Sequence, residues 1–121
     1  MDKALKDRWV AALRSGEYEQ GNGQLGRDGK YCCLGVLCEI ARPELEAAGV
    51  SVWGDRGVIF VDDASGYPSF LAADVLGLPD THGSVPTAAR FVEYEVENNL
   101  AAFNDSGFTF DQIADLIDNF Y

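Results

Sequence analysis

The sequence predicts an α+β fold in a single small domain, residues 1–121. Apolar residues recur at helical spacing near both ends, and two hairpin patterns and an alternating strand pattern lie between them. Strands and helices do not alternate as they do in a parallel βαβ sheet. We therefore expect N- and C-terminal helices packed with a buried cysteine-rich helix and a small antiparallel sheet.

Residues 2–15 have the pattern of an amphipathic helix. Leu5, Trp9 and Leu13 recur every four residues and therefore share one face. Gly16 follows directly and is a suitable residue to end the helix, because glycine adopts the left-handed backbone conformation found after helix C-termini.

A first hairpin and a buried helix follow. The dipeptide Asp28-Gly29 is typical of a tight hairpin turn. The run Tyr31–Ala41 is apolar except for Glu39, and it is far shorter than the roughly 18 apolar residues of a membrane span. We expect this run to form a buried helix that Pro43 closes.

The middle of the chain predicts a second hairpin and a short helix. Apolar runs at residues 50–53 and 58–61 flank turn residues 54–57. Ser69 is placed to cap a helix that extends to Leu76, where a glycine and a proline follow.

The clearest strand pattern is an alternation of apolar and acidic residues over six positions. The apolar members are Val92, Tyr94 and Val96, and the acidic members are Glu93, Glu95 and Glu97. Such an alternation predicts a strand with one dry face and one solvated face.

The chain ends in a predicted helix. Thr109 and Gln112 have the spacing of a capping box, and Phe108 and Ile113 have the spacing of a hydrophobic staple. Residues 100–103 before it are expected to form one more short helical turn. Together these helices imitate the start of a helix-turn-helix, but no basic recognition helix follows, so we expect no direct DNA binding.

Charge is distributed unevenly along the chain. Residues 1–42 hold seven Lys and Arg against six Asp and Glu, whereas residues 43–121 hold two against fourteen, and the net charge is −11. This balance disfavours nucleic acids and anionic membranes, because both are bound through clustered Lys and Arg. The acidic part either keeps the protein solvated or complements a basic partner.

The cysteines indicate a reducing compartment. Cys32, Cys33 and Cys38 are odd in number and crowd into seven residues, which is a poor disulfide framework. With neither a signal-peptide pattern nor a long apolar run, we expect a cytoplasmic protein. His82 is the one histidine available as a partner. We therefore expect these thiols to pack as small apolar groups rather than to bind metal or act as nucleophiles.

Two polar features remain as candidates for binding. The glycine-rich stretch from Gln20 to Gly26 lacks the Gly-Lys-Ser/Thr sequence of a phosphate loop, so its glycines serve either structural turns or a small anion held by backbone amides. Arg14, Arg27 and Lys30 lie near it in the sequence. Glu39, the lone acid of the apolar run, either reaches solvent, pairs with an arginine or binds a ligand.

Two sequence blocks carry a resemblance. The first is W-x3-L-x-S-G-x-Y-x-Q-G-x-G-x-L at residues 9–25, which continues to Y-C-C-L-G-V-L-C at residues 31–38. The second is F-N-D-S-G-x-x-F-x-x-I-A-D-x-I at residues 103–117. Together they resemble a family of small proteins commonly encoded by tailed phages and prophages. The resemblance implies a viral origin and names no activity, and residues 44–99 lie outside it.

Small phage proteins without catalytic motifs often act by binding, and counter-defence is a frequent use. By that association we expect a non-enzymatic viral accessory protein that sequesters a host nucleotide-derived immune signal in the host cytoplasm, with no cofactor, metal or catalytic residue. The expected ligand-binding residues are Trp9, Arg14, Tyr18, Gln20, Asn22, Arg27 and Tyr31.

Two alternatives stay open. The acidic part of the chain would suit an inhibitor that imitates nucleic acid and binds a host defence protein through Glu93, Glu95 and Glu97. A small hydrolase would instead use Cys33 or Glu39 together with His82. A homo-oligomer is compatible with either.

Overall fold

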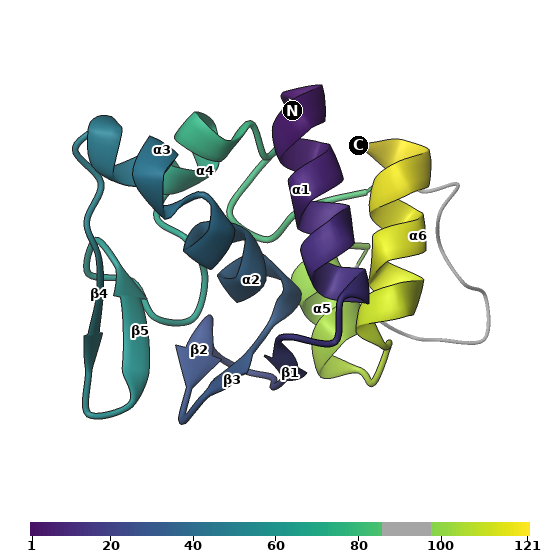
Figure 1. Ribbon diagram of the computed structural model, residues 1–121, viewed down its shortest axis with the longest axis horizontal. Coiled ribbons are helices and arrows are strands. Elements are labelled where there is room, and N and C mark those ends of the chain that lie inside the picture. Colours follow the sequence, from purple (N-terminus) through teal and green to yellow (C-terminus); the bar gives the residue numbers. More distant parts are fainter. Residues whose placement is uncertain (86–97) are drawn as a thin grey trace.

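Helices and strands occupy separate parts of the fold, which confirms the predicted α+β class (Figure 1). The computed structural model describes residues 1–85 and 98–121. The helices are α1 (Lys3–Arg14), α2 (Cys33–Ile40), α3 (Arg42–Ala47), α4 (Phe70–Leu76), α5 (Leu100–Asp105) and α6 (Phe110–Phe120). The strands are β1 (Glu19–Gln20), β2 (Gly26–Arg27), β3 (Lys30–Tyr31), β4 (Val52–Asp55) and β5 (Val58–Val61).

The helices from the two ends of the chain lie side by side, as expected (Figure 1). Leu5, Trp9 and Leu13 of α1 are all buried on one face, so the four-residue spacing predicted this packing correctly. The capping box of α6 is also confirmed, because the Gln112 amide donates to the Thr109 hydroxyl and the Thr109 amide donates to Gln112 Oε1. Among the described residues, no helix is both long and apolar enough to cross a membrane.

The cysteine-rich run forms a buried helix at the centre of the fold, in contact with α1, α3 and α5. It begins later than predicted, since Tyr31 belongs to β3 and Cys32 is the N-cap, whose sulfur accepts the Gly35 amide at 3.3 Å. Pro43 follows the end of α2 but does not stop helical structure. It lies in the first turn of α3, where its missing N–H leaves no helical hydrogen bond unmade.

Within residues 1–85 and 98–121, the strands form one five-stranded mixed sheet in the order β1-β3-β2-β5-β4. The expectation of an antiparallel sheet was therefore wrong at one edge, because β1 pairs with β3 in parallel. Both hairpin turns are two residues long, Asp28-Gly29 and Arg56-Gly57, and all four residues have positive φ. The second turn is tighter than predicted because Gly54 pairs with Ile59 inside the ladder.

The short helices follow the predicted signals. Ser69 caps α4 through its hydroxyl, which accepts the Ala72 amide, and Gly77 ends that helix in the left-handed conformation. Residues 100–103 are helical, and α5 continues to Asp105. The predicted strand of residues 92–97 lies outside the described residues.

Helix α2 packs closely against the backbone of Leu25, the residue before β2. Gly35 is fully enclosed, and a Cβ built on it would lie 1.7 Å from the carbonyl oxygen of Leu25. The same carbonyl accepts the Cys32 amide at 3.2 Å, which holds the start of α2 onto this segment. Any side chain at position 35 would therefore push the helix off the sheet.

We predict that Gly35→Ala lowers the free energy of unfolding by about 3 kcal/mol or more, because the methyl group would overlap backbone that cannot move aside cheaply. Urea denaturation of the purified protein measures this. Gly66→Ala is the matched control, since nothing lies within 4 Å of its Cβ position. Equal stability of the two variants would contradict the packing described for α2.

Candidate functional site

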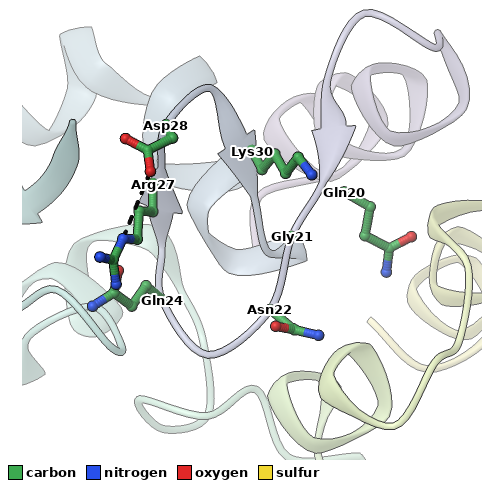
Figure 2. Close-up of a pocket in the computed structure, with 7 residues that line it drawn as sticks. All are labelled: Gln20, Gly21, Asn22, Gln24, Arg27, Asp28 and Lys30. Carbon is green, nitrogen blue, oxygen red and sulfur yellow. Dashed lines mark ion pairs between the residues drawn. The ribbon is translucent and has the colours of Figure 1, made fainter.

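A polar groove of about 380 Å³ lies on the first three strands (Figure 2). It lies at the glycine-rich segment of residues 20–26, where the sequence predicts a ligand. The lining residues are Gln20, Gly21, Asn22, Gln24, Arg27, Asp28 and Lys30. Three of the seven predicted ligand-binding residues, Gln20, Asn22 and Arg27, therefore meet at this groove.

The loop around the groove is anchored at both ends. Gly21 donates its amide to the Tyr31 carbonyl at 2.8 Å, and a Cβ at this position would lie 2.9 Å from Lys30 Cβ. Gly23 donates to the Asp105 carboxylate at 3.0 Å, and the fully buried Leu25 donates to the Ser65 carbonyl at 2.7 Å. Glycine is thus favoured at position 21, where the chain leaves β1 close beside β3, and the groove has a fixed backbone wall.

Two cations border the groove without strong partners. Arg27 Nε lies 3.8 Å from Asp28 Oδ2, and Lys30 Nζ lies 3.8 Å from Glu19 Oε1. All four side chains are more than half exposed. Exposed ion pairs this long contribute little and are screened by salt, so either cation can turn to an incoming anion at small cost.

Two amide side chains add hydrogen-bonding capacity. Asn22 is exposed at the outer bend of the loop, and Gln24 lies beside Arg27 (Figure 2). Gln24 Oε1 is buried and accepts no hydrogen bond within the described part of the chain. A buried acceptor of this kind is costly unless a donor reaches it. No sequence signal singled out Gln24, because a lone glutamine in a loop has no diagnostic spacing.

Gln20 is committed to the fold rather than to a ligand, which corrects its predicted role. Its Nε2 donates to Asn104 Oδ1 at 3.0 Å and to the Phe108 carbonyl at 2.7 Å. Its Oε1 accepts the Phe110 amide at 3.1 Å. In Figure 2 the side chain points away from the groove toward the C-terminal helices. Both of its amide protons are already in use.

Asn104 completes this buried network. Its side chain is almost fully enclosed, at 3% exposure. Its Oδ1 also accepts the Cys33 amide at 3.2 Å, and its Nδ2 donates to the Gly21 carbonyl at 2.8 Å. The two sequence blocks that lie at opposite ends of the chain, residues 9–38 and 103–117, are therefore joined at this asparagine.

None of the predicted aromatic residues lines the groove. Trp9 has 0% exposure, and its indole donates to the Cys33 carbonyl at 2.9 Å, so it offers no surface for a ligand to stack on. Tyr18 and Tyr31 pack edge to face with each other, their ring centroids 5.4 Å apart, and both rest against the core. The helical spacing of Trp9 predicted that its side chain is buried, and this prediction is correct. The predicted role of Trp9 as a surface on which a ligand stacks was wrong.

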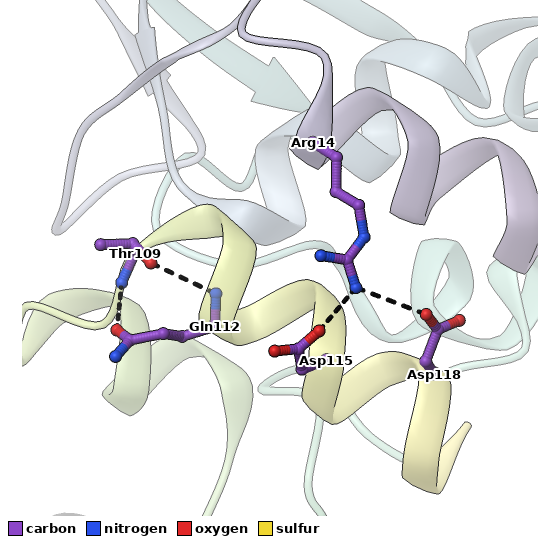
Figure 3. A network of polar contacts seen from close by, with 5 residues as sticks. All are labelled: Arg14, Thr109, Gln112, Asp115 and Asp118. Atoms are coloured by element: carbon purple, nitrogen blue, oxygen red, sulfur yellow. Dashed lines mark hydrogen bonds and ion pairs between the residues drawn. The ribbon is translucent and has the colours of Figure 1, made fainter.

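Arg14 is also absent from the groove. Its Nη2 lies 2.6 Å from Asp115 and 3.5 Å from Asp118, so the side chain joins α1 to α6 (Figure 3). Sequence proximity suggested a place near the glycine-rich loop. The carboxylates of α6 lie a hundred residues further along the chain, and only the packing of the terminal helices reveals them.

The thiols are apolar core groups, as predicted. Cys33 and Cys38 have 0% exposure and Cys32 has 4%. Burial raises the pKa of Cys32 to about 11 and raises the pKa of the other two as well. A protonated, enclosed thiol is a poor nucleophile and a poor metal ligand. Among the described residues, no group of three or more His, Cys, Asp or Glu could hold a metal ion.

The remaining candidate acid and base have structural partners. Glu39 receives two hydrogen bonds from Arg42 Nη2, at 2.8 and 2.9 Å, so of the three roles left open for this acid of α2 the structure shows the pairing with an arginine. The His82 ring stacks on Tyr67 and its Nδ1 lies 2.9 Å from the Thr81 hydroxyl. These contacts disfavour the hydrolase alternative. Glu93, Glu95 and Glu97 lie outside the described residues, and their role stays a prediction.

Comparison with known proteins adds a family but no activity. One family model, described as a domain of unknown function, matches residues 1–121. The chain belongs to the DUF8296 family. No curated protein and no solved structure matches it. For this DUF8296 protein, the groove of residues 20–30 is therefore the basis for a functional proposal.

We predict that Asn104→Ala lowers the free energy of unfolding by about 3 kcal/mol, because the Cys33 amide, the Gln20 amide and the Gly21 carbonyl would each lose a buried partner. Asn22→Ala, an exposed asparagine of the same loop, should change it by no more than about 0.5 kcal/mol. Denaturation midpoints of the two variants measure the difference. Similar midpoints would mean that the amide network contributes little.

We also predict that stability falls as pH rises through about 9. The unfolded chain loses thiol protons near pH 9, whereas burial raises the pKa of all three folded thiols, so the folded state binds more protons above that pH. Each thiol contributes at most about 1.4 kcal/mol per pH unit. Unfolding free energies measured from pH 7 to pH 10 should fall less steeply for Cys38→Ala. Parallel curves would contradict this origin of the pH dependence.

Proposed function

We propose that this protein is a non-enzymatic binding protein that sequesters a phosphorylated, nucleotide-derived immune signal in the groove of residues 20–30. The observation that carries the proposal is the placement of Arg27 and Lys30 on one groove, where each forms a long, exposed ion pair of 3.8 Å. A guanidinium can bind a phosphate through two parallel hydrogen bonds, and an ammonium adds a point charge.

The size and polarity of the groove fit such a ligand. Its volume of about 380 Å³ falls within the range of small-molecule sites. Asn22 and Gln24 supply amide groups that can pair with a base or a sugar, and Asp28 supplies an acceptor for a hydroxyl or amino group. Because none of the described lining residues is aromatic, affinity would come from charge and hydrogen bonds, and it should weaken as salt is raised.

The charge of the chain as a whole opposes an anionic ligand, but the groove lies in its balanced part. Residues 1–42 carry a net charge of +1, whereas the excess of acid belongs to residues 43–121. At the groove, Arg27 and Lys30 stand beside the carboxylates of Asp28 and Glu19, so a phosphate would have to draw both cations away from these long, exposed ion pairs. Local potential, not total charge, sets the affinity of such a site.

Sequestration rather than turnover is supported by what surrounds the groove. The lining residues can hold and orient a phosphate, and the thiols that would be the natural nucleophiles are buried and protonated. The resemblance of the two sequence blocks to phage-encoded proteins supports a viral setting, and hence counter-defence in the host cytoplasm. Capturing a signal requires no chemistry, only affinity and abundance.

Calorimetric titration with a cyclic dinucleotide, ADP-ribose and inorganic pyrophosphate tests the proposal. We expect at least one of the three to bind, and we expect Arg27→Gln and Lys30→Gln each to weaken that binding by about tenfold or more. Arg14→Gln is the matched control, because it removes the same positive charge from α1 without touching the groove. Melting curves show that each variant is folded.

Two results would overturn the proposal. One is that none of the three probes binds the unmodified protein. The other is that Arg14→Gln weakens binding as much as Arg27→Gln does, since the effect would then reflect net charge rather than a site.

A further inference from the structure

Four large apolar side chains are exposed where the β4–β5 hairpin meets the start of α4. Their exposed fractions are 40% for Trp53, 42% for Tyr67, 86% for Phe70 and 52% for Leu71. We call these four residues the aromatic surface. Single exposed apolar residues are common in proteins, but a group of them rimmed by polar residues is typical of an interaction site.

Asp62 holds the parts of this surface together. Its carbonyl accepts the Trp53 indole N–H at 2.8 Å, and its carboxylate accepts the Ser69 hydroxyl at 3.0 Å. Ser69 is the N-cap of α4, so Phe70 follows it directly. Asp62 has a φ of 53°, a backbone conformation unusual for a residue other than glycine. Asp62 thus links Trp53 of the hairpin to the N-cap of α4 at the edge of the surface.

Two of the three rings, Trp53 and Tyr67, are held in place by neighbouring rings. Trp53 stacks on Phe60 with centroids 4.5 Å apart and planes 13° apart. Tyr67 lies against the His82 ring at 3.9 Å. Side chains that are ordered before binding lose less conformational entropy when a partner arrives, which makes them effective anchors.

Acidic residues border the aromatic surface. Asp55, Asp63 and Asp74 are exposed, and none forms an ion pair within the described part of the chain. Arg56, in the hairpin turn, is the single Lys or Arg between residues 43 and 85. Arg42 also reaches the Val52 carbonyl, at 2.7 Å, but it is paired with Glu39 at 2.8 Å. The surface therefore combines an apolar centre with a mainly acidic rim.

We propose that the aromatic surface docks a segment of a partner protein that carries apolar side chains flanked by Lys or Arg. The apolar side chains would cover Trp53 and Phe70, and the basic ones would meet the acidic rim. A second copy of this chain fits poorly, because a symmetric contact would set the same acids against each other in two molecules of net charge −11. Nucleic acids and anionic membranes are disfavoured by the same charge.

This second surface is independent of the groove, which is lined by residues 20–30 and involves none of the same side chains. A protein with both surfaces could hold a small ligand and a protein partner at once. Loss of one activity would leave the other measurable.

Two synthetic amphipathic helices of matched length, one of Leu and Lys and one of Leu and Glu, serve as probes. Trp9 is fully buried, so changes in tryptophan emission report on Trp53. We expect the Leu–Lys helix to shift that emission to shorter wavelength and to protect it from a soluble quencher, with the Leu–Glu helix inactive. Phe70→Ser should weaken binding by about tenfold or more.

Phe120→Ser is the matched control, since Phe120 is also exposed, at 39%, but lies on α6. It should leave binding unchanged. A second variant, Asp63→Asn with Asp74→Asn, should slow association and flatten its salt dependence without touching an apolar contact.

Three outcomes would overturn the inference. Equal binding of the two helices would show that the acidic rim selects nothing. Unchanged affinity of Phe70→Ser would place the binding elsewhere on the molecule. Self-association in sedimentation experiments that Phe70→Ser abolishes would assign the aromatic surface to a second copy of this chain.

Discussion

The fold depends most on a pair of buried amide side chains, Gln20 and Asn104. Gln20 belongs to β1 and Asn104 to α5, and together they satisfy backbone groups at the start of α2, at the residue after β1, in the α5–α6 turn and at the start of α6. A buried amide that lost one of these partners would keep its desolvation cost without the compensating bond. The network therefore favours one arrangement of these four elements, which apolar packing alone would not specify so narrowly.

The groove inherits its geometry from that network. Gly21 and Gly23, which bend its wall, are tied to Asn104 and to Asp105 respectively, so the loop is anchored on the C-terminal helices. The charged side chains that project from the loop remain exposed and weakly paired. A rigid backbone that carries weakly paired cations suits the ligand-binding role we propose, because ordering costs little when a ligand arrives. The acidic part of the chain meanwhile carries the aromatic surface, so the two proposed surfaces differ in both charge and chemistry.

Local signals predicted local structure well. Thr109 with Gln112, Ser69, and the turn residues Asp28 and Gly29 each act through hydrogen bonds or backbone angles within a few residues, and each stands where the sequence placed it. The site was predicted less completely. The glycine-rich segment does line a groove, but Trp9 and Arg14 were assigned to it by nearness in sequence, and both are held by residues from distant elements.

The fold class, the capped ends of α4 and α6, the Asp28-Gly29 turn and the burial of the cysteines could all be predicted from the sequence, because periodicity, capping and hydrophobicity are properties of short segments. Which polar side chains are exposed and able to bind a ligand could be seen only in the tertiary structure. Gln20 and Asn22 are similar amide residues of one glycine-rich segment, yet the Gln20 side chain is hydrogen-bonded to Asn104 whereas the Asn22 side chain is exposed. Hydrogen-bond partners such as Gln20 and Asn104 come from distant parts of the chain. Their distance along the sequence does not show that they are close in space, so only the folded structure reveals the pairing.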